Sequence, residues 1–248
     1  MIKSAFLGAA TVAAAFAMVP SAASAQCVGT CGVNLGTDGV VTGPHSWVST
    51  FGGVTGVGLA QGDETNGSTF TTAAFTANGT DELKFDFNYV TADGAGFADY
   101  AWVELLGPTG SLILFTARTT TSGDTVPGFS LPGLAPGVVL TPATTPIIPG
   151  GPVWSPLDAS SGFCWDTGCG YTGWIGMTFT PAAGTYQLRF GAVNWSDSLF
   201  DSGLAWRGAL IGDVPIDPIP EPGTWAMMIA GFGLVGFAAR RRRIAVAA

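Results

Sequence analysis

The feature that most constrains this fold is a strict alternation of apolar and polar residues in short runs. The stretch 81–91, DELKFDFNYVT, places Leu83, Phe85, Phe87 and Tyr89 on one face of a strand, with polar residues between them. A period of two residues is typical of a strand that buries one face and exposes the other. The central chain shows no long window with the 3.6-residue period of an amphipathic helix. The pattern therefore predicts antiparallel sheet.

Other short runs repeat this pattern between turns, and Leu204, Trp206 and Leu210 are expected on one side of the last run. The 37 Gly and 16 Pro residues suit the many turns that such a fold requires. Seven or more short strands predict an all-β fold, an antiparallel β-sandwich of the jelly-roll type. The further runs lie at 68–77, 99–106, 111–119, 171–180, 185–194 and 202–214.

One long segment interrupts the strands. Residues 120–162 contain eight of the sixteen prolines and few strand signals. A loop of this length inside a compact domain is either functional or disordered. Its apolar residues, which include Trp154, favour burial, so we expect an ordered loop that lies over the sandwich. A mobile flap is the alternative.

The N-terminus has the features of a signal peptide, predicted over residues 1–25. Lys3 precedes an apolar run, and Ala23 and Ala25 fit a small-x-small cleavage site, so that the mature chain begins at Gln26. An uncleaved membrane anchor is the alternative. Export places the mature protein where disulfides form.

The four cysteines form two short local pairs. Cys27 lies four residues before Cys31, and Cys164 lies five residues before Cys169. In an exported protein each pair is expected to close a small disulfide loop. Zinc binding is the alternative, but no histidine accompanies the pairs.

The predicted mature domain, residues 26–215, is strongly acidic. Residues 26–220 carry four basic residues against sixteen acidic ones, a net charge of −12. Coulomb repulsion disfavours nucleic acid and anionic membranes as partners of such a surface.

The C-terminal segment, residues 216–248, ends the chain differently. Residues 224–239 carry no charge, and a predicted transmembrane helix there is followed by a cluster of four arginines. Before it, Pro220 and Pro222 flank Glu221, and two prolines this close favour an extended peptide.

In combination these features resemble the PEP-CTERM sorting signal of Gram-negative bacteria, which a membrane-embedded exosortase recognises and is understood to cut near the motif. The resemblance implies that the exosortase is a partner and that the segment directs sorting and processing. The central region is also similar to uncharacterised extracellular β-sandwich domains of such proteins. The residues that carry the sorting resemblance are Pro220, Glu221, Pro222, Trp225, Ala226, Met227, Met228, Arg240, Arg241, Arg242 and Arg243.

Acidic residues cluster in two segments next to predicted strands. TADGAGFADY contains Asp93 and Asp99, and NWSDSLFDSG contains Asp197 and Asp201. Carboxylate and carbonyl oxygens are the ligands that Ca²⁺ prefers, so these four residues are a candidate Ca²⁺ site. The alternative is that they stabilise turns through their own backbone.

Tryptophans are abundant and divide by position. Three in predicted strands, Trp102, Trp174 and Trp206, are expected in the core. Three in predicted loops, Trp154, Trp165 and Trp195, are candidates for an exposed platform that binds the face of a sugar.

Catalytic signals are weak. The chain has a single histidine, His45, and no Gly-x-Ser-x-Gly nucleophile elbow, which disfavours a serine hydrolase. A metallohydrolase needs several histidine ligands, which the chain lacks. A polysaccharide hydrolase needs paired carboxylates, for which Glu104 beside Trp102 and a loop aspartate are the candidates.

These observations predict a non-enzymatic exported protein with no certain cofactor. We expect an intermediate tethered to the inner membrane, then exosortase processing and transfer to the cell surface or an extracellular polysaccharide matrix. The β-sandwich would be a structural or adhesive module. The alternatives are an extracellular polysaccharide hydrolase and a carbohydrate- or Ca²⁺-binding module that stays anchored in the membrane.

Overall fold

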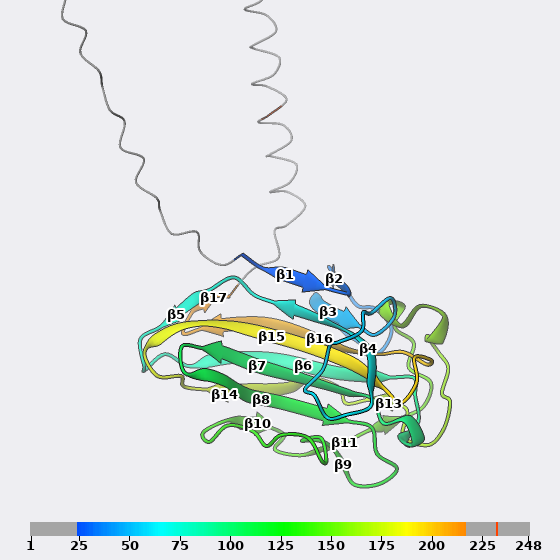
Figure 1. The fold of residues 1–248 in the computed structure, drawn as a ribbon. Helices are drawn as coiled ribbons and strands as arrows, with labels where there is room; N and C mark the ends of the chain where they lie inside the picture. The colour runs from blue at the N-terminus through cyan, green and yellow to red at the C-terminus, as the bar shows by residue number, and fades with distance from the viewer. Residues whose placement is uncertain (1–23, 217–231, 233–248) are drawn as a thin grey trace, which may run out of the picture.

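The computed structural model describes residues 24–216 and Phe232. These residues form two large antiparallel sheets packed face to face, which confirms the predicted β-sandwich (Figure 1). The predicted signal peptide and the predicted sorting segment lie almost wholly outside the described residues.

The first sheet has six strands, with β5 pairing alongside one end of β15. In spatial order its strands are β1 (Gln26–Val28), β4 (Glu64–Thr71), β15 (Gly184–Trp195), β7 (Tyr100–Gly107) and β8 (Gly110–Arg118), with β5 (Phe75–Ala77).

The second sheet has nine strands, three of which are short additions at its margins. Its main path is β10 (Val139–Thr141), β14 (Ile175–Phe179), β6 (Leu83–Thr91), β16 (Ser202–Ile211), β3 (His45–Ser49) and β2 (Thr30–Asn34). The additions are β12 (Ile148–Pro149), β13 (Gly170–Tyr171) and β17 (Val214–Pro215). A separate pair joins β9 (Asp124–Val126) to β11 (Thr145–Pro146), and two 3₁₀ helices, η1 (Ala95–Phe97) and η2 (Ser155–Ser160), lie in loops.

The connectivity of the eight principal strands is that of a jelly roll. Taken along the chain they are β3, β4, β6, β7, β8, β14, β15 and β16. One sheet has the order β3-β16-β6-β14 and the other β4-β15-β7-β8, so neighbours are first-eighth-third-sixth and second-seventh-fourth-fifth. This order is produced by two interlocked Greek keys. It brings strands that are distant in sequence together at each end of the sandwich.

The core lies between the sheets and is rich in aromatic rings. Alternation along β6 is confirmed, because its predicted inward residues Leu83, Phe85, Phe87 and Tyr89 are buried. Phe87 of the second sheet meets Phe115 of the first with ring centroids 3.7 Å apart. Phe190 stacks on Trp206 at 4.1 Å and an interplanar angle of 7°. These contacts join the layers directly.

The predicted orientation of one residue in β16 is wrong. Leu210 was expected on the same side as Leu204 and Trp206, but it is half-buried and Ile211 takes the core position. The register of β16 against β6 shifts between Arg207 and Leu210. An extra residue in one strand reverses the facing of every residue beyond it.

The long proline-rich segment is ordered, as predicted. At its start, Val126 packs into the core at the edge of the sandwich. Further along, Trp154 and Leu157 are fully buried against Val90 and Ala205, outside the second sheet. The segment therefore covers both an edge and part of the outer face.

Both predicted disulfides form. Cys27–Cys31 joins β1 of the first sheet to β2 of the second. Cys164–Cys169 closes a short loop just before β13. The first is a covalent connection between the edges of the two layers.

Candidate functional site

Four predicted acidic residues lie at one end of the sandwich, where β6 and β15 end and β7 and β16 begin. Asp93 follows β6, Asp99 precedes β7, Asp197 follows β15, and Asp201 precedes β16. Their charges act on one another, because Asp197 and Asp201 both raise the pKa of Asp93. The jelly-roll connectivity thus gathers two acidic segments that are about a hundred residues apart in the chain.

Asp99 is a buried cross-link between the sheets. The Ser202 hydroxyl donates to Asp99 Oδ2 at 2.6 Å, and the Trp195 N–H donates to Oδ1 at 2.8 Å. Burial raises the pKa of Asp99 well above its usual range, and the charge of Asp93 adds to this effect. Both oxygens are therefore occupied by protein donors.

Asp201 has a similar structural role. It accepts hydrogen bonds from Thr50 at 3.1 Å and from Ser160 at 3.0 Å. Burial raises its pKa, and these two hydroxyl groups partly offset that rise. Asp201 thereby ties η2 to β3 and β16.

Asp93 differs from both. Its Oδ1 accepts the Gly94 N–H at 2.6 Å, but its Oδ2 is buried and has no hydrogen-bond partner. Burial raises the pKa of Asp93 to about 7. A buried carboxylate oxygen without a partner is costly unless a proton, water or ion satisfies it.

A four-carboxylate Ca²⁺ site is not what the structure contains. Within residues 24–216 and at Phe232, no group of three or more His, Cys, Asp or Glu side chains is arranged to hold a metal ion. The carboxylate oxygens of Asp99 and Asp201 accept hydrogen bonds from protein donors. The prediction that these two residues bind Ca²⁺ is therefore wrong. The unpartnered oxygen is on Asp93.

The three tryptophans predicted to form a sugar-binding platform differ in their exposure to solvent. Trp154 is fully buried, so its place in an exposed platform is wrong. Trp195 is half-buried beneath Arg118, whose guanidinium carbon lies 4.2 Å from the ring centroid. Trp165 is 56% exposed, and its ring stacks on Phe200 at 4.8 Å.

The exposed Trp165 and the half-buried Phe200 on which it stacks are fixed in position by the loops that carry them. The disulfide loop Cys164–Cys169 carries Trp165. The backbone N–H of Trp165 donates to the backbone oxygen of Ala92 at 3.0 Å. Phe163 and Leu199 extend the apolar surface next to the pair in sequence, and both are about 60% exposed. Phe200 was not foreseen, because a single phenylalanine in a loop gives no pattern.

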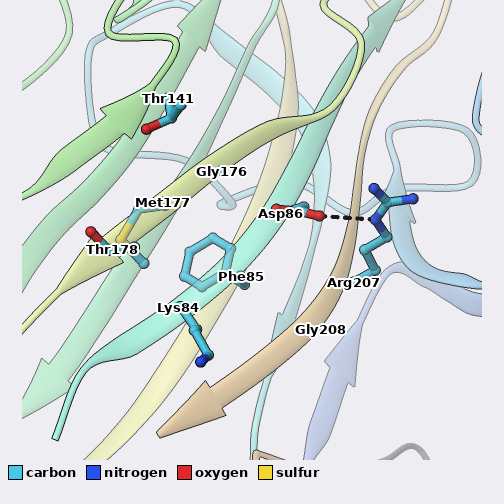
Figure 2. Close-up of a pocket in the computed structure, with 9 residues that line it drawn as sticks. All are labelled: Lys84, Phe85, Asp86, Thr141, Gly176, Met177, Thr178, Arg207 and Gly208. Carbon is cyan, nitrogen blue, oxygen red and sulfur yellow. Dashed lines mark hydrogen bonds and ion pairs between the residues drawn. The ribbon is translucent and has the colours of Figure 1, made fainter. Parts of the chain in front are cut away.

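A hollow lies on the outer face of the second sheet (Figure 2). It encloses about 340 Å³ between β10, β14, β6 and β16. Figure 2 shows Arg207 Nε bonded to Asp86 Oδ2, a distance of 3.0 Å. Trp174, expected in the core, is instead half-buried with its ring 4.2 Å from the Arg207 guanidinium carbon. The lining residues are Lys84, Phe85, Asp86, Thr141, Gly176, Met177, Thr178, Arg207 and Gly208.

Glu104 lies on β7 and is almost fully buried. Its Oε2 is 3.4 Å from Arg189 Nη1 and accepts the Trp102 indole N–H at 3.2 Å. A catalytic acid must reach the bond that it protonates. Here the carboxylate is held by a neighbouring strand and by its own.

His45 is a buried packing residue. Its Nδ1 lies 2.8 Å from Gly43 O, and the Trp154 indole N–H donates to its Nε2 at 3.4 Å. Both contacts suit the neutral ring, with the proton on Nδ1. Burial lowers the pKa of His45, while Gly43 O opposes that shift.

This environment predicts a pH dependence of stability. The folded state binds the His45 proton more weakly than the unfolded state, so stability falls as the pH drops below about 6.5. In urea titrations from about pH 7.5 to pH 5, the native chain should lose stability relative to His45→Gln, by at most about 1.4 kcal/mol per pH unit. Gln keeps one donor and one acceptor but does not titrate. Parallel curves for the two proteins would contradict the assignment.

The described residues therefore define a disulfide-linked jelly roll. The segment that follows is more specific: residues 218–243 match the family model for the PEP-CTERM protein-sorting motif. The chain carries this motif, which marks it as an exported protein sorted by an exosortase. No curated protein matches the chain.

The predicted sorting residues, Pro220 to Pro222, Trp225 and Arg240 to Arg243, all lie inside the matched segment and outside the described residues. The predicted transmembrane helix also lies inside the matched segment, and of its residues only Phe232 is described. In the part of the chain that the structure describes, no helix is long and apolar enough to span a membrane.

Proposed function

We propose that an exosortase processes this chain near Pro220 to Pro222 and delivers its jelly roll to the cell surface or to an extracellular polysaccharide matrix. The observation that carries this proposal is the sorting motif at residues 218–243. The uncharged stretch 224–239 and the following arginines would tether the intermediate in the inner membrane. The jelly roll would then be a non-catalytic structural or adhesive module.

A non-catalytic role agrees with how the candidate catalytic groups are engaged. Glu104 is bound by Arg189 and Trp102, and the single histidine of the chain is buried against Trp154. The described residues assemble neither a nucleophile–base pair nor a free pair of carboxylates around these groups.

Intact mass of the chain, isolated from the host with and without its exosortase, tests the sorting proposal. A mass that ends near Pro220 to Gly223 only when the enzyme is present is the expected result. A chain that still ends at Ala248 in both strains would overturn the proposal.

An adhesive role would use the pair Trp165 and Phe200. An exposed indole that is already stacked on one face offers its other face at little cost in conformational freedom. Its neighbour Asp166 supplies an acceptor for sugar hydroxyl groups, and its surroundings are neutral or acidic. A neutral polysaccharide of the host matrix is the ligand that fits this surface.

Trp165→Ala should weaken binding to matrix polysaccharide purified from the host by about tenfold or more. Affinity electrophoresis of the full chain measures this loss. Leu35→Ala removes another exposed apolar side chain, at the end of β2, and should leave binding unchanged. If Arg207→Ala abolishes binding while Trp165→Ala does not, the ligand occupies the hollow of Figure 2 and the Trp165 site is wrong.

A further inference from the structure

The layer between the two sheets changes from apolar to polar at the end where β6 and β15 terminate. Hydrogen bonds cross from sheet to sheet here, for example from Ser202 to Asp99 and from Ser68 Oγ to Ser49 O. Burying so many polar groups is stable only when each finds a partner. Fully buried polar residues at this end include Thr50, Ser68, Thr91, Asp93, Asp99, Thr119, Asn194 and Ser202.

Some polar groups of this layer lack a hydrogen-bond partner. The Ser202 hydroxyl donates to Asp99 Oδ2 at 2.6 Å and also contacts Thr91 Oγ1 at 2.8 Å, so these groups are satisfied. Two buried atoms remain without a partner, Asp93 Oδ2 and Asn194 Oδ1. The amide oxygen can only accept a hydrogen bond, and so can the Asp93 oxygen when the carboxyl group is ionised. The described protein therefore provides neither a donor nor a positive charge at these two oxygens.

The orientation of Asn194 follows from its neighbours. Asn66 Nδ2 donates to Thr50 O, so Asn66 Oδ1 is left to accept from Asn194 Nδ2 at 3.2 Å. Asn194 Oδ1 must then point away from Asn66 and β4. On the other side of β15 lies β7, where Val193 pairs with Tyr100, so the next residue, Asn194, lies opposite Asp99. The unpartnered amide oxygen is therefore buried next to the chain segment that carries Asp99.

Among the described residues, no basic side chain forms an ion pair with these acids. Within residues 24–216 the ion pairs are Arg189–Glu104 and Arg207–Asp86, both on strands elsewhere. Arg118 acts on Asp99 over a longer distance, but its Nε donates to Ala98 O and its guanidinium covers Trp195. The negative charge of Asp93 therefore has no counter-ion within the described protein.

We propose that Asp93 and Asn194 bind a Ca²⁺ ion in this polar layer. Ca²⁺ accepts mixed carboxylate, amide and backbone oxygens in irregular geometry, whereas Mg²⁺ demands a near-ideal octahedron. One ligating carboxylate and one amide agree with the lack of a three-carboxylate group among the described residues. Such a site belongs with extracellular modules whose Kd is on the order of 10⁻⁴–10⁻³ M.

The ion would also stabilise the loop that presents Trp165. Ala92 O accepts the Trp165 N–H, and a Cβ on Gly94 would lie 2.5 Å from the Asp166 Cβ. The turn that carries Asp93 is thus packed against the disulfide loop of Trp165. An ion that stabilises the turn at Asp93 would therefore also stabilise the disulfide loop that carries Trp165.

Calorimetric titration of the full chain with CaCl₂, together with thermal unfolding, tests the proposal. The native chain should bind Ca²⁺ saturably, and at about a hundred times Kd its Tm should rise by roughly 5–10 °C. Asp93→Asn should weaken binding by about a hundredfold or more, since even indirect supports of a metal site are worth 10–100-fold. Without Ca²⁺ its Tm should be no lower than that of the native chain, because the substitution removes an unpaired buried charge.

Glu82→Gln is the matched control, because it removes one exposed carboxylate at the other end of β6 and should bind Ca²⁺ like the native chain. Asn194→Leu removes the second ligand without changing charge and should also weaken binding. No saturable binding by the native chain up to about 10 mM Ca²⁺, well above the weakest Kd expected, would overturn the proposal. So would equal losses in Asp93→Asn and Glu82→Gln, which would show nonspecific attraction to an acidic surface.

Discussion

Trp154→Ala is expected to lower the free energy of unfolding by about 3–5 kcal/mol, the range for removal of a large aromatic ring from a core. The ring is fully buried and donates its indole N–H to His45. It packs edge-on against Trp47 at 6.4 Å and lies so close to Gly203 that a Cβ there would be 2.6 Å from the ring. The small pocket left behind cannot collapse, because β3 and β16 are fixed by the sheet. Urea titration measures the loss.

Trp165→Ala is the matched control for this prediction. It removes the same side chain from a site that is 56% exposed, so its effect should be within about 1 kcal/mol. Similar losses in the two variants would mean that the long loop is not anchored through Trp154. Loss in Trp154→Ala alone would show that the loop is an integral part of the fold.

Replacing Pro220, Glu221 and Pro222 with alanine should abolish C-terminal processing of the exported chain. The two prolines restrict the backbone to extended forms, and the glutamate places a single charge between them. Three alanines favour helix instead, which would extend the apolar segment. The altered chain should therefore retain its arginine cluster, and intact mass should place its end at Ala248.

Pro218→Ala is the control for the sorting prediction, because it removes a neighbouring proline outside the tripeptide. Its chain should be processed like the native one. If the triple variant is still cut at the native position, the tripeptide is not what the exosortase reads. Loss of processing in both variants would point to the extended character of the whole linker.

The strand pattern could be read from the sequence because it depends on local alternation. The run LKFDFNYV buries its apolar residues as predicted, and the turns at Gly and Pro separate the strands where expected. The disulfides and the sorting motif were equally local, since each is a short spacing of distinctive residues. β3 was missed, because HSWVS is short and only weakly alternating.

The candidate sites could not be read in the same way. Trp154 and Trp165 both lie in proline- or cysteine-rich loops, yet one is fully buried and the other is exposed. The difference arises from Gly203 and Ala205, small residues on β16 that leave room for Trp154. Those residues are some fifty positions away in sequence, and no local pattern connects them.

The sequence by itself determined the all-β class, the facing of the main strands, the disulfide loops and the sorting motif, because each depends on residues close together in the chain. Tertiary structure alone decided which acids are satisfied and which is not. Asp93, Asp99 and Asp201 have the same carboxylate and nearly the same local sequence signal. Jelly-roll connectivity places Ser202, Thr50 and Ser160 against two of them and leaves Asp93 Oδ2 without a partner. Whether a buried oxygen is satisfied depends on distant donors, which only the packing of the sheets brings within reach.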